Sequence, residues 1–159
     1  MTVLVGAHVV GGLIAVTGGV VAMLTRKGSR AHRRGGRTWL GGLAVLCATA
    51  PALAAPDWSR FWHLPVLGAV AAGCALVGYL AIRRRRIVAH IVGMGGSFVV
   101  ALTAFYVDNG PKLPLWDQLP PTVFWFLPAG VGVPIIVRAV HRRTSGRLAT
   151  LPVMRGRDG

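Results

Sequence analysis

The sequence predicts an all-α integral membrane protein with five transmembrane helices, its N-terminus outside and its C-terminus in the cytoplasm. Of its 159 residues, 53% are hydrophobic and only 14% are charged, and the mean hydropathy is +0.59. A soluble domain carries about 25% charged residues, so this composition indicates a membrane protein. The net charge of +14 gathers in three clusters, and apolar runs separate these clusters from one another.

Five apolar runs approach the length that a membrane crossing needs. A hydrocarbon core about 30 Å thick takes roughly 20 residues of α-helix. We expect the runs to form one transmembrane domain over residues 1–141, followed by a basic cytoplasmic tail over residues 142–159. The expected helices lie near residues 2–24, 38–55, 64–82, 87–106 and 121–140.

The placement of the positive charges predicts which way the chain threads. Sixteen of the 18 Lys and Arg residues lie in the segment 25–37, in the run 83–86, or in the tail from Arg138 onward; Arg60 and Lys112 are the other two. Short loops rich in Lys and Arg stay in the cytoplasm, which puts all three clusters on that side. The clusters also suit anionic lipid headgroups as partners. Because they are not spread along basic helices with exposed aromatics, we expect no nucleic-acid partner.

Small residues recur at every fourth position in the first two expected helices. Such stripes let helix backbones approach closely in lipid, where apolar surface alone gives no drive to associate. We expect them to bind neighbouring helices, either of a partner protein or of a second copy of this chain. The two stripes are Ala7, Gly11, Ala15 and Gly19 in the first helix, and Ala44, Ala48 and Ala52 in the second.

The second expected helix has a competing interpretation as an export signal. Arg33 and Arg34 precede the run WLGGLAVLCATAPALAA, which ends in a site suited to cleavage after Ala55. However, one apolar run precedes this stretch and three follow it, so we interpret it as an uncleaved membrane helix. Cys47 and Cys74 both fall inside expected helices, where we expect them to behave as small buried hydrophobes without a disulfide.

The later elements follow from turn residues and from charge. The segment APDWSRFWHL places aromatic rings at headgroup level between the second and third helices. The run 83–86 leaves almost no loop, so the third and fourth helices are expected to be antiparallel neighbours. The last helix contains Pro128 and Pro134 around two glycines, and we expect it to be kinked or locally unwound.

Three histidines are the candidate cofactor-binding residues, because ionisable side chains within spanning helices are rare and mark functional sites by default. His8, His32 and His90 are each followed by glycine three or four positions later, on the same face of a helix. The missing side chain leaves room for a flat ligand such as haem b, whose iron takes neutral imidazoles as axial ligands. A packing hydrogen bond across helices is the competing interpretation.

The depths of these histidines decide which of them can share a metal. His8 and His90 lie near opposite ends of their helices, about 15–20 Å apart along the membrane normal at 1.5 Å per residue, so they cannot share one. His32 and His90 can share one if the second helix begins slightly earlier than residue 38. His8 is then expected to face His63 or Asp108 on its own side, giving two sites in two leaflets.

The histidine pattern resembles a family of small bacterial membrane proteins of unknown function. The resemblance rests on His8 with its trailing glycines, on the segment HRRGGRTWL that starts at His32, and on His90 early in a later helix. It covers about residues 1–106 and implies membrane helices with recurring histidines, but no particular activity. The matching positions are His8, His32, Arg33, Gly36, Arg37 and His90.

The sequence leaves three classes of function open. It contains no P-loop, C-x-x-C or H-E-x-x-H motif of a soluble enzyme. The first class is a haem- or metal-binding membrane redox protein, and the second is a non-catalytic subunit or assembly factor that binds partner helices and anionic lipid. A small transporter is a weaker alternative, because the chain shows no internal sequence duplication. The excess of arginine over lysine and the many Ala, Gly and Pro residues indicate a GC-rich bacterium, and hence its plasma membrane.

Overall fold

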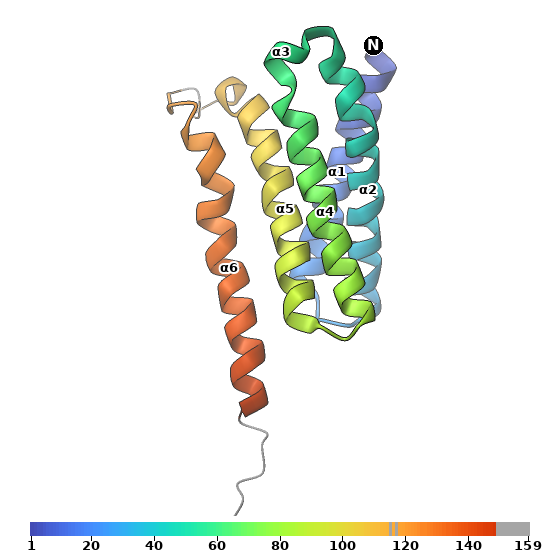
Figure 1. Cartoon of the computed structure of the whole chain (residues 1–159), viewed down its shortest axis with the longest axis vertical. Helices are drawn as coiled ribbons and strands as arrows, with labels where there is room; N and C mark the ends of the chain where they lie inside the picture. Colours follow the sequence, from blue (N-terminus) through green and yellow to red (C-terminus); the bar gives the residue numbers. More distant parts are fainter. Residues whose placement is uncertain (115, 117, 149–159) are drawn as a thin grey trace, which may run out of the picture.

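The computed structural model is an all-helical bundle, and it describes residues 1–114, 116 and 118–148. Five of its helices are long and apolar enough to cross a membrane, which confirms the expected all-helical fold with five candidate spans. A short α-helix and two 3-10 turns connect them (Figure 1). The long helices are α1 (Thr2–Leu24), α2 (Arg30–Ala54), α4 (His63–Arg83), α5 (Ile87–Asn109) and α6 (Val123–Leu148), and the short elements are η1 (Ala55–Asp57), α3 (Trp58–Phe61) and η2 (Gly110–Lys112).

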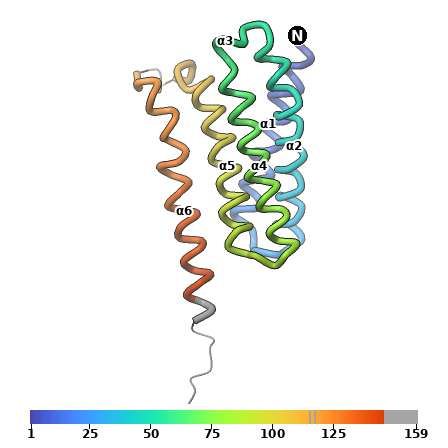
Figure 2. The backbone as a smooth tube through the Cα atoms, viewed as in Figure 1, coloured from blue at the N-terminus to red at the C-terminus, as the bar shows by residue number. Residues whose placement is uncertain are grey.

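The five long helices form two hairpins and one added helix. α1 packs against α2, α4 packs against α5, and the α2–α4 contact joins the two hairpins. α6 packs against α5 at the edge of the bundle and extends beyond it (Figure 1). The turns of both hairpins lie at one end of the bundle, as the tube in Figure 2 shows. We call this end the basic end, because residues 26, 27 and 83–86 lie there.

Two helix boundaries differ from the expected ones by eight residues, and both differences lengthen a helix into basic sequence. α2 begins at Arg30, eight residues earlier than expected, so the connection between α1 and α2 is only the segment 25–29. The Ser29 side chain accepts a hydrogen bond from the backbone N–H of His32 and thereby caps the helix. α6 continues to Leu148, which converts the start of the expected tail into helix. The rest of that tail, residues 149–159, lies outside the described residues.

α6 also corrects the expectation of an unwound last helix. Pro128 and Pro134 both lie inside it, and the helix continues through them from Val123 to Leu148. In lipid, a proline within a helix is tolerated when neighbouring groups satisfy the backbone carbonyl that it frees. A discontinuous helix, of the kind that forms substrate sites in transporters, is therefore not found in this part of the chain.

Glycines hold each hairpin together by letting the two backbones touch. A Cβ added to Gly35 would lie 2.7 Å from the carbonyl oxygen of Gly18, and one added to Gly42 would lie 2.6 Å from that of Gly11. The second hairpin repeats this contact, since a Cβ on Gly93 would lie 2.6 Å from the backbone nitrogen of Gly78. Most of the small-residue stripe of α1 is thus used within the chain, whereas the stripe of α2 at 44, 48 and 52 is exposed.

The two hairpins repeat one layout, although the sequence shows no internal duplication. Each consists of two long antiparallel helices joined by a short basic turn. A shift of 58 positions places His32 on His90 and Gly35 on Gly93, and both glycines sit at the close crossing of their own hairpin. The repeat is carried by these few positions rather than by overall identity, so a search for duplicated sequence does not find it.

Candidate functional site: paired histidines at the basic end

His32 and His90 come together across the two hairpins, at the basic end of the bundle. Their ring centres are 6.4 Å apart, and the two ring planes make an angle of 78°. His32 lies in the first turn of α2 and His90 in the first turn of α5. The early start of α2 is what makes this possible, since it places His32 on a helix rather than in a loop.

Backbone hydrogen bonds fix the position of one proton on each ring. Nδ1 of His32 lies 2.9 Å from the carbonyl oxygen of Ala22, and Nδ1 of His90 lies 2.9 Å from that of Gly78. A carbonyl can only accept, so each Nδ1 carries a proton and donates it. Nε2 is therefore the nitrogen of each ring that is left to bind a metal, the arrangement in which metal-binding histidines are held by a backbone partner.

The glycines that follow these histidines do not have the role expected of them. Gly35 and Gly93 were expected to leave room for a flat ligand, but the backbone of the neighbouring helix fills the space beside each one. The space beside Gly11, which follows His8, is likewise filled by Val45. Gly36 differs, because a Cβ placed there would have no atom within 4 Å although the residue is only partly exposed. Open space therefore adjoins His32 one turn along α2.

Two buried polar groups lie two helical turns from the paired histidines. Trp39 and Ser97 follow His32 and His90 by seven residues each, so each shares a helix face with its histidine. Among the described residues, Nε1 of Trp39 and Oγ of Ser97 are buried and make no hydrogen bond. The ring of Trp39 packs 5.1 Å from that of Phe98 in the same seam between α2 and α5. The sequence analysis missed both groups, although the spacing of seven residues was a signal for them.

His8 lies in a separate place, near the opposite end of the bundle. Its Nδ1 is 2.7 Å from the hydroxyl of Thr49, and this hydroxyl donates to the carbonyl of Val45 at 2.8 Å. The ring therefore donates to Thr49, in a packing hydrogen bond between α1 and α2. Thr49 is 17 residues along α2 from His32, a distance of about 25 Å at 1.5 Å per residue.

Of the two expected partners of His8, Asp108 is near enough to interact with it electrostatically, whereas His63 does not face it. His63 instead packs its ring beside Trp62 and Trp125, whose ring centres are 6.2 and 5.7 Å away. Within the described residues there is no group of three or more His, Cys, Asp or Glu side chains that could hold a metal ion. Of the three candidate ligands, the structure thus joins His32 with His90 and separates both from His8.

Fold and site together define a helical bundle that has five helices able to span a membrane and one pair of histidines between its two hairpins. No protein-family model, curated protein or solved structure matches the chain. The function is therefore argued from the site itself.

Proposed function

We propose that the protein is a haem b-binding membrane redox protein in which His32 and His90 are the two axial ligands of the iron. The observation that carries this proposal is the spacing of the two rings. Imidazoles that bind one metal from opposite sides, at about 2 Å through nitrogen, have ring centres roughly 6 Å apart. The rings of His32 and His90 are 6.4 Å apart before any ligand is considered.

The number of ligands favours haem over a bare metal ion. A protein-bound zinc ion usually takes four ligands, and at least three of them come from protein side chains. Two histidines alone are a poor site for such an ion, and the described residues offer no third ligand group. Haem iron is already held by four nitrogens of the macrocycle, so two imidazoles complete its coordination.

The surroundings of the pair support a polar, partly flat ligand. Gly36 leaves open space beside His32. The indole N–H of Trp39 and the hydroxyl of Ser97 are buried polar groups without partners in the described chain, and such groups call for a ligand or a water. A haem held by both His32 and His90 would supply one-electron transfer at this place. The proposed role is therefore electron transfer.

We further propose that the basic end faces the cytoplasm of a bacterium and that the chain lies in the plasma membrane. The support is the distribution of arginine and lysine, because loops rich in these residues are retained on the cytoplasmic side. The test uses thiol labelling of intact cells, with Cys47 and Cys74 replaced by Ala. We expect Lys112→Cys to react with a membrane-impermeant reagent and Arg26→Cys to be protected. The reverse pattern would invert the orientation.

Absorption spectroscopy tests the haem proposal. The protein, purified in detergent with haem supplied during expression, should show a Soret band and a low-spin spectrum. We expect H32A and H90A each to lose the band and H8A to keep it, because His8 lies about 25 Å away. H8A is the matched control, since it also removes a hydrogen-bonded histidine from a helix. A wild-type protein that folds but takes up no haem would disprove the proposal.

A second function is favoured by one surface feature, the exposed small-residue stripe of α2. Ala44, Ala48 and Ala52 are exposed on the bundle and follow one another along a single helix face. Such a stripe suits close contact with a helix of another membrane protein, as in a non-catalytic subunit. Purification from native membranes in mild detergent tests this function. Loss of a bound partner in an A48L variant would support it, and recovery of a lone chain would oppose it.

A further inference from the structure

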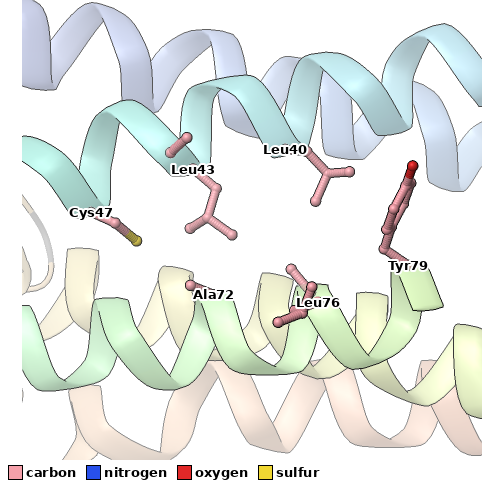
Figure 3. A pocket seen from close by; sticks show the side chains of 8 residues that line it. Leu40, Leu43, Cys47, Ala72, Leu76 and Tyr79 are labelled. Carbon is pink, nitrogen blue, oxygen red and sulfur yellow. The ribbon is translucent and has the colours of Figure 1, made fainter. Parts of the chain in front are cut away.

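A hollow between α2 and α4 lies where the two hairpins meet (Figure 3). Its volume is about 290 Å³, close to the lower end of the roughly 300–1,000 Å³ that small-molecule sites occupy. This is room for one flat ring and the beginning of an apolar tail. The residues labelled in Figure 3 that line it are Leu40, Leu43, Cys47, Ala72, Leu76 and Tyr79.

The walls of this hollow are apolar and open toward lipid. Leu43 and Ala75 at its back are almost fully buried and belong to the core, whereas Leu76 at its edge is 57% exposed. Both helices are spanning segments, so the opening faces the hydrocarbon layer. An apolar molecule dissolved in the bilayer can therefore enter from the side, without passing through water.

Toward the basic end, the hollow is lined by Tyr79, which carries the only hydroxyl among its lining residues, and Arg83 lies next to Tyr79 outside the lining. The Tyr79 hydroxyl points from α4 toward α2 (Figure 3). The guanidinium carbon of Arg83, one turn further along α4, lies 6.0 Å from the centre of the Tyr79 ring. A phenol and a guanidinium suit an occupant that carries carbonyl oxygens on a flat ring at the head of an apolar chain.

This polar end is directly connected to the paired histidines. The carbonyl of Gly78, which accepts the hydrogen bond from His90, belongs to the same peptide group as the backbone nitrogen of Tyr79. His90, a proposed ligand of the iron, therefore hydrogen-bonds to the backbone immediately before Tyr79.

We infer that the hollow between α2 and α4 binds a membrane quinone, with its headgroup at Tyr79 and Arg83 and its tail along Leu76, Ala72 and Cys47. The inference names the redox partner of the protein and so rests on the haem site proposed above. Its binding step needs neither the iron nor a change in oxidation state, and it can be measured separately.

The test measures binding of decylubiquinone to the purified full chain in lipid nanodiscs, by gel filtration followed by extraction. Ala72→Phe fills the hollow, and we expect it to weaken binding at least about tenfold while the Soret band is unchanged. Tyr79→Phe and Arg83→Gln remove the donors and should weaken binding several-fold. Val70→Phe is the matched control, because Val70 is an exposed residue of α4 that does not line the hollow.

The outcomes separate the two proposals. Binding that is lost in A72F and kept in V70F supports the quinone site, with or without haem. Equal binding by wild type and A72F overturns it, as does co-extraction of a tightly held phospholipid that the quinone does not displace. A missing Soret band overturns the haem proposal alone.

Discussion

A single methyl group at the α1–α2 crossing should disturb the histidine pair from a distance. In Gly35→Ala, the new Cβ would lie 2.7 Å from the carbonyl oxygen of Gly18 and 2.9 Å from the backbone nitrogen of Ala22. Ordinary contacts begin at 3.4 Å, so the two helices must separate by about 0.7 Å. Ala22 is also the residue whose carbonyl holds Nδ1 of His32 at 2.9 Å. The same separation stretches this distance to about 3.6 Å, which no longer makes a hydrogen bond.

The expected cost follows from overpacking a tight helix contact. Inserting a methyl group where there is no space costs about 1–3 kcal/mol. The gain in helix propensity on replacing glycine by alanine, about 1 kcal/mol, offsets part of it. Gly41→Ala provides a matched control in the same helix, since a Cβ there meets nothing within 4 Å and the propensity gain is the same. We expect G35A to be less stable than G41A by about 1–3 kcal/mol.

Two measurements check this prediction. Thermal unfolding of the detergent-solubilised variants, followed by circular dichroism, should give a lower melting temperature for G35A than for G41A. The ratio of Soret to protein absorbance should also fall in G35A, because the His32 ring loses the contact that orients it. If G35A and G41A have the same melting temperature and bind haem equally well, the close backbone contact does not hold the site and the reasoning is wrong.

Two further predictions concern the basic end. Arg85 is in the left-handed region with φ 57°, which costs an L-residue roughly 1–2 kcal/mol, so Arg85→Gly should raise the melting temperature while Arg84→Gly should not. Burial lowers the pKa of Lys27 below its usual value of 10.5, so the unfolded chain holds this proton more tightly than the folded one. The contribution of Lys27 to stability should therefore rise with pH through the window between the lowered pKa and 10.5, and melting curves of wild type and K27Q should diverge there. An unchanged melting temperature in R85G would contradict the first prediction. Parallel melting curves of wild type and K27Q across that pH window would contradict the second.

The number and nature of the helices could be predicted from the sequence because both follow from hydropathy alone. The start of α2 could not, because the residues from Arg30 to Arg37 resemble a loop in charge while arginine is also a good helix former. The residue that marks the observed start of α2 is Ser29, since a serine before a run of helix formers is a typical N-cap. Hydropathy measures where a helix enters lipid rather than where its hydrogen bonds begin.

The pairing of His32 and His90 was predictable from the sequence, but the role of the glycines beside them was not. His32 and His90 were expected to share a ligand only if α2 began early, and the structure has that early start. The glycines were expected to leave room for a ligand, although Gly35 and Gly93 are needed for contact between helix backbones. Spacing along one helix cannot tell these roles apart, because both need a missing side chain on the same face. Only the position of the neighbouring helix decides between them.

The two proposed haem ligands belong to different hairpins, so a bound haem would hold the hairpins together. His32 belongs to the first hairpin and His90 to the second, so each half of the molecule supplies one coordinating nitrogen. A bound haem would then stabilise the assembled halves by about 2.7 kcal/mol at a free concentration one hundred times its dissociation constant. Haem binding and assembly of the two hairpins would therefore be thermodynamically linked.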